Sequence, residues 1–155
     1  MAELLHIDEP TRGPASAPQW AAFLELGFRP LYLAGCIWAA VAVALWVFAP
    51  GLLRGQLSGV LWHAHELLWG FIATIAVGFL LTAGSNWTGI NPLKGAALGG
   101  LSLLWVLARV SYLIPGATAF WLAAGVESIF FLWAASALGR AIYAARSRRN
   151  YGLPP

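Results

Sequence analysis

The sequence has little charge and almost no sulfur. Only 10% of its 155 residues are charged, whereas 60% are hydrophobic. So little charge cannot cover a surface that faces water, which excludes an ordinary soluble domain and predicts an integral membrane protein. The single cysteine, Cys36, lies inside an apolar run, which excludes an internal disulfide, a cysteine-rich metal site and covalent haem attachment through paired cysteines. Met1 is the single methionine, so a copper ion would have to rely on histidine ligands.

The sequence also lacks the common motifs of hydrolytic and nucleotide chemistry. It has no glycine-rich phosphate-binding loop, no Gly-x-Ser-x-Gly nucleophile motif and no pair of carboxylates near the middle of a span. Neither chemistry is therefore predicted, and whether the protein is an enzyme stays open. The basic cluster near the C-terminus follows a long apolar run. We interpret it as a topology signal that contacts lipid headgroups, and we expect no nucleic-acid partner.

Long apolar runs predict an all-α fold, namely a polytopic membrane protein with about four transmembrane helices in a bundle. Proline and glycine separate the runs, which extend over about residues 31–48, 60–83, 93–113 and 118–145. The lipid bilayer is therefore the first partner that the sequence predicts.

We expect one membrane domain flanked by two tails. Residues 1–28 form a cytoplasmic N-terminal tail that can include an interfacial helix, residues 29–145 form the four-helix transmembrane domain, and residues 146–155 form a basic cytoplasmic C-terminal tail. The orientation follows from the basic residues, because cytoplasmic loops are enriched in Lys and Arg. In the loops and tails of the opposite side lies only Arg54. The predicted cytoplasmic side carries Arg12, Arg29, Lys94, Arg140, Arg146, Arg148 and Arg149.

Five ionisable residues lie inside the predicted spans: His63, His65, Glu66, Arg109 and Glu127. Each costs about 2.5 to 3.5 kcal/mol to insert, so each requires a partner or a function. At about 1.5 Å of rise per residue, His63 to Glu66 share one depth with Arg109 near the outer end, whereas Glu127 lies near the midplane. Arg109 can offset the charge of Glu66, anchor an anionic group such as a propionate, or extend to the outer interface. Glu127 is expected to be protonated, paired or part of a proton path.

His63 and His65 lie two positions apart on the second predicted helix. At about 100° per residue they point roughly 160° apart, so a regular helix cannot direct both at one metal ion. On the same helix, a stripe of small residues at a spacing of four continues from Glu66 and predicts close packing against a neighbouring helix. The stripe consists of Gly70, Thr74, Gly78 and Thr82.

This stripe places Glu66 and His63 toward the bundle. It places His65 on the side of Trp62 and Trp69, an aromatic wall that suits either a flat macrocycle or the headgroup belt. Two histidines and a glutamate within four residues favour binding of haem or a metal over a purely structural role, which is the alternative.

In order and spacing, four motifs resemble the NnrS family, which comprises polytopic bacterial membrane proteins that contain haem and copper and are linked to nitric oxide and nitrosative-stress tolerance. The motifs are Gly27-Phe28-Arg29-Pro30, Trp62-His63-Ala64-His65-Glu66, Gly78-Phe79-Leu80-Leu81-Thr82-Ala83 and Asn86-Trp87-Thr88-Gly89. The resemblance implies a location in the bacterial inner membrane. It also implies that His63 and His65 are ligands of haem b or copper, with Glu66 beside them as a supporting or proton-handling group. Their spacing favours two separate sites, and the residues themselves suggest Arg109 beside the cofactor and Glu127 as a further proton-handling group.

Members of that family have around three times as many spans, with further histidines in later helices. The resemblance therefore leads us to expect an N-terminal portion or a truncated paralogue, whose metal site requires a second membrane chain or a second copy of this one. Two other functions stay open. One is a non-catalytic helical module or remnant without metal, and the other is an electron carrier like a b-type cytochrome that acts as a dimer.

Overall fold

The computed structural model of the protein describes residues 20–57 and 59–151. All the regular structure in these residues is helical, which confirms the predicted all-α fold. A short helix α1 (Trp20–Phe23) precedes the first long helix, and the predicted interfacial segment is thus helical for a single turn. The rest of the predicted N-terminal tail, residues 1–19, lies outside the described residues.

Within the described residues, four helices are long and apolar enough to cross a membrane, which confirms the predicted number of spans. They are α2 (Phe28–Phe48), a continuous helix Gly59–Thr88, α5 (Gly95–Leu113) and α6 (Ala117–Tyr151). The last helix continues past residue 145, where the transmembrane domain was predicted to end.

The second span changes its helix type along its length. It begins as α3 (Gly59–His65), continues as the π-helix η2 (Glu66–Ala73) and ends as α4 (Thr74–Thr88). A π-helix has i→i+5 hydrogen bonds and therefore shifts the side-chain register relative to an α-helix. The shift occurs directly after the two histidines.

Proline and glycine account for the ends of the spans. Pro30 occupies the first turn of α2, where its missing N–H costs nothing. After α2, the short 3₁₀ turn η1 (Pro50–Leu52) reverses the chain. Gly89, with φ of 68°, supplies the left-handed cap of α4, and Gly116, with φ of 114°, lies in the short connection before α6.

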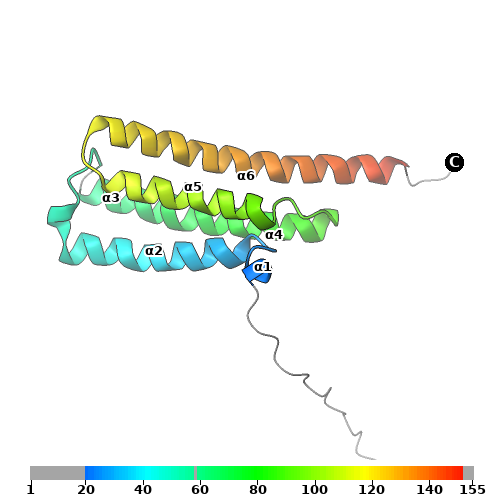
Figure 1. Ribbon diagram of the computed structural model, residues 1–155, viewed down its shortest axis with the longest axis horizontal. Coiled ribbons are helices and arrows are strands. Elements are labelled where there is room, and N and C mark those ends of the chain that lie inside the picture. Colours follow the sequence, from blue (N-terminus) through cyan, green and yellow to red (C-terminus); the bar gives the residue numbers. More distant parts are fainter. Residues whose placement is uncertain (1–19, 58, 152–155) are drawn as a thin grey trace, which may run out of the picture.

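The four spans lie side by side in an up-and-down bundle (Figure 1). α1 and the C-terminal part of α6 lie at the same end, together with the connection between α4 and α5. At that end the backbone N–H of Gly95 donates to the carbonyl of Leu24 at 2.7 Å, and Asn91 donates to the carbonyl of Glu25 at 2.7 Å. The opposite end carries η1 and the connection between α5 and α6.

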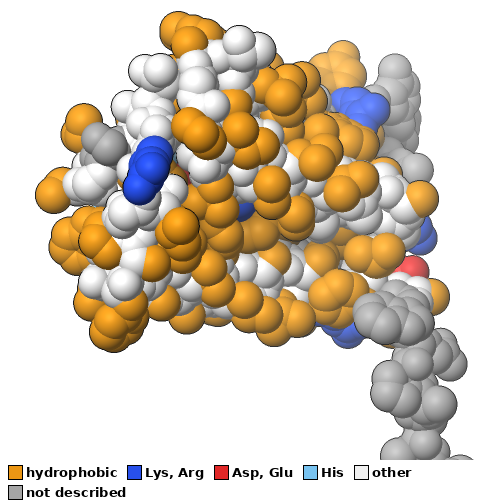
Figure 2. Space-filling view, turned by 60° about the vertical axis from the view of Figure 1, so that its left-hand side comes forward, with side chains coloured by type: hydrophobic (Ala, Val, Ile, Leu, Met, Phe, Trp, Pro, Cys, Tyr) orange, Lys and Arg blue, Asp and Glu red, His pale blue; other side chains and the backbone are white. Residues whose placement is uncertain are grey.

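The core consists of interdigitated aliphatic and aromatic side chains. Leu31, Leu98, Leu101 and Phe130 are almost completely buried. At Gly78 the helices approach closely, because an added Cβ would lie 3.2 Å from the Cβ of Leu31. The predicted small-residue stripe is thus confirmed as a packing surface. Outside the core, hydrophobic side chains cover most of the molecular face in Figure 2, as a lipid-facing surface requires.

Candidate functional site

Five polar side chains from three of the spans meet near the end of the bundle that carries η1. They are His65 of α3, Glu66 of η2, Arg109 and Tyr112 of α5, and Glu127 of α6, and we call them the polar cluster. All of them except Tyr112 were candidate site residues from the sequence, which considered them singly or in pairs. The structure brings them into one network.

Arg109 is the centre of the polar cluster. Its side chain is 2% exposed, and its Nη1 donates to Glu66 Oε2 at 2.7 Å. Its Nη2 donates to Glu127 Oε1. The prediction that Arg109 offsets the charge of Glu66 is confirmed, whereas the alternative that it extends to the interface is wrong. A guanidinium has donors in a fixed fork, which lets it serve two carboxylates at once.

Glu66 is fully buried and uses both carboxylate oxygens. Oε2 accepts from Arg109 and also from Trp38 Nε1 at 2.7 Å. Oε1 lies 3.0 Å from His65 Nδ1. A buried carboxylate is tolerated only where such partners replace its lost hydration, so the inward orientation predicted for Glu66 is confirmed together with its physical cause.

Glu127 joins the same network. Its Oε1 accepts from Arg109, and its Oε2 accepts from the hydroxyl of Tyr112 at 3.1 Å. The sequence placed Glu127 deeper than the other four ionisable groups, near the midplane. The expectation that Glu127 is paired is confirmed, because these contacts join it to Arg109 and Tyr112.

His65 faces the interior of the bundle and lies between the two carboxylates. Its Nε2 is 3.3 Å from Glu127 Oε2, and its ring centroid is 4.5 Å from that of Tyr112. The sequence instead placed His65 on one aromatic side with Trp62 and Trp69. Those two tryptophans diverge, since Trp62 is 1% exposed and packs near α2, whereas Trp69 is 44% exposed and contacts Phe131.

Gly70 makes room for the polar cluster. A Cβ added there would lie 2.9 Å from Arg109 Nη1, 3.0 Å from Glu66 Oε2 and 3.0 Å from the ring of Trp38. Any larger residue would therefore push the guanidinium or the carboxylate from its position. The stripe glycine predicted for helix packing thus also accommodates the charged groups.

His63 lies outside the polar cluster. Its ring stacks on Trp46 of α2, with centroids 4.2 Å apart and an angle of 13° between the planes. Its Nδ1 is buried and has no hydrogen-bond partner among the described residues. The stacking fixes the plane of the ring. Within the described residues, its buried nitrogen shares the lack of a partner with Trp62 Nε1 and Arg109 Nε.

Three hydrogen-bonding side chains were missed by sequence reasoning. Tyr112 belongs to the polar cluster, Trp38 donates to its member Glu66, and Trp105 Nε1 donates to the buried hydroxyl of Thr74 at 2.7 Å. A signal was available, because buried Trp and Tyr in a span require an acceptor for their N–H or O–H group. The sequence alone does not reveal which acceptor each of them reaches.

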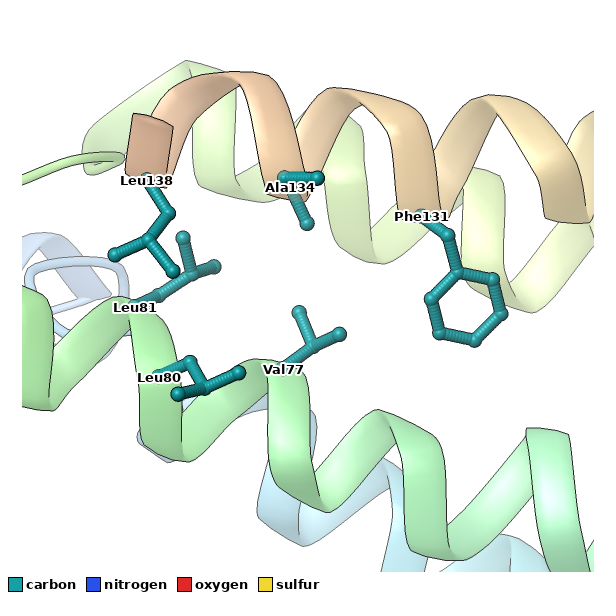
Figure 3. Close-up of a pocket in the computed structure, with 7 residues that line it drawn as sticks. Val77, Leu80, Leu81, Phe131, Ala134 and Leu138 are labelled. Carbon is teal, nitrogen blue, oxygen red and sulfur yellow. The ribbon is translucent and has the colours of Figure 1, made fainter. Parts of the chain in front are cut away.

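A separate apolar groove lies between α4 and α6 (Figure 3). It encloses about 270 Å³ and is lined by Val77, Leu80, Leu81, Phe131, Ala134, Ala135 and Leu138. None of these side chains offers a metal ligand or a hydrogen-bonding group, so the groove is not part of the polar site.

Metal ligands are sparse in the part of the chain that the structure describes. Within it, no group of three or more His, Cys, Asp or Glu side chains is arranged to hold a metal ion. A metal at His63 would therefore take its other ligands from outside these residues or keep open positions.

Comparison with known proteins identifies one family. Residues 22–155 match the model of a protein family described as NnrS protein. Searches of curated proteins and of solved structures found no match. The family match covers all the spans, the polar cluster and both histidines of the second span.

Proposed function

Because the chain belongs to the NnrS family, we propose that it is an integral protein of the bacterial inner membrane that binds haem b or copper and takes part in the response to nitric oxide. The membrane location is supported by the four apolar spans. The observation that carries the binding proposal is the buried, unpartnered Nδ1 of His63.

The surroundings of His63 fit one protein ligand of such a group. A ligating imidazole needs a free nitrogen and a fixed ring plane. Trp46 holds the ring by stacking, and no described residue competes for Nδ1. His63 would therefore hold the metal, and the bound metal would supply the position at which nitric oxide coordinates.

Arg109, Glu66 and Glu127 have a different part in this proposal. Both terminal nitrogens of Arg109 contact carboxylates of the chain itself, so its charge is already balanced without a propionate. The three residues instead balance one another's charge inside the membrane and fix the helix that carries His63. Glu127 is 13% exposed and is the most accessible of the three, as a proton-handling group requires.

The proposal requires a second source of ligands. His63 alone does not complete the coordination of haem or copper, so a second membrane chain or a second copy of this chain is the expected partner. The lipid bilayer surrounds the assembly. Both termini are proposed to lie in the cytoplasm, with the polar cluster toward the outer side.

The experiment is an absorption spectrum and a metal analysis of the full chain purified in detergent after growth with haem precursor or copper. The variants are His63→Ala and, as a matched control, His6→Ala, which removes the third histidine of the chain. A Soret band or bound copper that is lost only in His63→Ala supports the proposal. A folded, colourless and metal-free wild type would overturn it.

A second candidate is favoured by the mutual ion pairs within the polar cluster. Arg109, Glu66 and Glu127 are paired with one another without any added group, as expected of a helical module that requires no metal. This candidate predicts that His63→Ala leaves stability and spectrum unchanged. The same spectra therefore separate the two functions.

A further inference from the structure

The two histidines of the second span have different surroundings. His63 has a buried nitrogen without a partner among the described residues, whereas each ring nitrogen of His65 faces a carboxylate oxygen. Nδ1 is 3.0 Å from Glu66 Oε1, and Nε2 is 3.3 Å from Glu127 Oε2. An imidazole has no other nitrogen to offer a metal.

The contacts of His65 close a ring of four side chains. Arg109 contacts Glu66 and Glu127 through its two terminal nitrogens, and His65 contacts the same two residues through its two ring nitrogens. All four carboxylate oxygens are thereby used. The basic and acidic groups alternate around the ring, so the two carboxylates need not face each other directly.

A metal at His65 would conflict with this ring in two ways. It would lie about 2 Å from a ring nitrogen, in the space between that nitrogen and a carboxylate that also contacts Arg109. A metal cation would then be held close to a permanently charged guanidinium in a low-dielectric setting, which is unfavourable. In addition, the bound metal would displace Glu66 or Glu127 from the ring nitrogen that it now contacts, which would open the ring of ion pairs.

We propose that His65 is an interhelical bridge between Glu66 and Glu127 and is not a ligand of the metal. It holds the two carboxylates where Arg109 can contact both, and it thereby fixes the second span against α6. The bridge involves only side chains of this protein and does not depend on a bound metal. The assignment of the metal to His63 and not to His65 rests on the proposed function.

The bridge is tested by a double-mutant cycle on the full chain in detergent. The variants are His65→Ala, Glu127→Gln and their combination, and the measurement is the equilibrium constant of unfolding in a denaturing-detergent titration. Once one partner is removed, loss of the other should cost less. The change in the unfolding constant of the double variant should therefore be about tenfold smaller than the product of the two single changes. His65→Gln retains one donor and should recover part of the loss.

A matched cycle pairs His63→Ala with Glu127→Gln. His63 neighbours the bridge in sequence but has no contact with Glu127, so these effects should multiply to within about twofold. A coupling of His65 with Glu127 as small as that of His63 would overturn the bridge.

The metal assignment is tested by loading the wild type, His63→Gln and His65→Gln with haem or copper. His65→Gln should keep the Soret band or the copper content to within about twofold, whereas His63→Gln should lose it. Loss in a folded His65→Gln protein would show that His65 is a ligand. A wild type that binds neither group would overturn the proposed function, and the cycle would still decide the bridge.

Discussion

At the scale of single residues, Arg109 shows how this protein tolerates charge inside a membrane. The guanidinium is 2% exposed and contacts carboxylates from two other helical segments. Burial of an ion removes its hydration, and only well-placed partners compensate for that loss. Removal of one partner is consequently more harmful than replacement of the whole group, because it leaves an uncompensated charge behind.

The first prediction concerns Glu66, which is fully buried. Glu66→Ala should lower the free energy of unfolding by about 3 to 5 kcal/mol, since it leaves Trp38 and Arg109 Nη1 without their acceptor inside the bundle. Thermal unfolding in detergent, followed by circular dichroism, measures the loss. Glu25→Ala is the control, because Glu25 is exposed and only its backbone carbonyl is used. Equal stabilities of the two variants would contradict the role given to the pairing.

The second prediction concerns Thr74, whose hydroxyl accepts from Trp105 at 2.7 Å and donates to the carbonyl of Trp69 at 3.1 Å. Thr74→Val keeps the shape but strands the buried indole N–H, so it should cost about 1 to 3 kcal/mol. Thr118→Val, at an exposed position, should stay within about 0.5 kcal/mol of the wild type. Chemical unfolding with tryptophan fluorescence follows both variants.

Sequence reasoning predicted the pairing of Glu66 with Arg109 because both groups had to find a partner at one depth. It did not predict the position of His65. A helical wheel assumes about 100° per residue, whereas the helix becomes a π-helix at the next residue, Glu66. The wheel grouped His65 with Trp62 and Trp69, but the π-helix shifts only Trp69 relative to His65, since Trp62 and His65 both belong to α3. One of the carboxylates that flank His65 comes from α6, and a wheel of one helix does not show such a contact.

At the scale of elements, the π-helix η2 is the feature that assembles the polar cluster. Glu66, its first residue, contacts α5, and Gly70, inside it, leaves room for the guanidinium and for Trp38. Segments of this type are frequent at functional sites because they redirect side chains without interrupting the helix.

The third prediction concerns Gly70 within this element. Gly70→Ala should destabilise the protein by about 1 to 3 kcal/mol, because the new Cβ would lie 2.9 Å from Arg109 Nη1. Alanine is otherwise the better helix former by about 1 kcal/mol. Gly125→Ala is the matched control, since nothing lies within 4 Å of an added Cβ there. Thermal unfolding should show a loss for Gly70→Ala and none for Gly125→Ala.

The spans themselves could be predicted from hydropathy and from the prolines and glycines between them. Their number is confirmed, and Pro50 and Gly89 lie at helix ends as expected. The π-helix could not be predicted, since its residues are as apolar as those of an α-helical span and carry no separate signal. The contacts of Glu127 with Arg109 and His65 could not be predicted either, because rise per residue locates a backbone and not the end of a long side chain.

At the scale of the whole molecule, the two ends of the bundle differ. One end carries α1, the connection between α4 and α5 and the C-terminal part of α6 (Figure 1). The basic residues Arg29, Lys94 and Arg140 belong to segments at or near that end, whereas Arg54 follows η1 at the other end. Cytoplasmic loops carry the excess of Lys and Arg, so the end with α1 is expected to face the cytoplasm.

The fourth prediction tests this orientation with single cysteines in a Cys36→Ala background. Leu52 in η1 is 65% exposed and lies at the predicted outer end, and Glu25 is exposed at the predicted cytoplasmic end. In intact spheroplasts, a membrane-impermeant maleimide should label Leu52→Cys at once and Glu25→Cys only after permeabilisation. The Cys36→Ala protein should stay unlabelled. The reverse pattern would contradict the predicted orientation. It would place the polar cluster toward the cytoplasm, so that its carboxylates would exchange protons with the cytoplasm and not with the outer side.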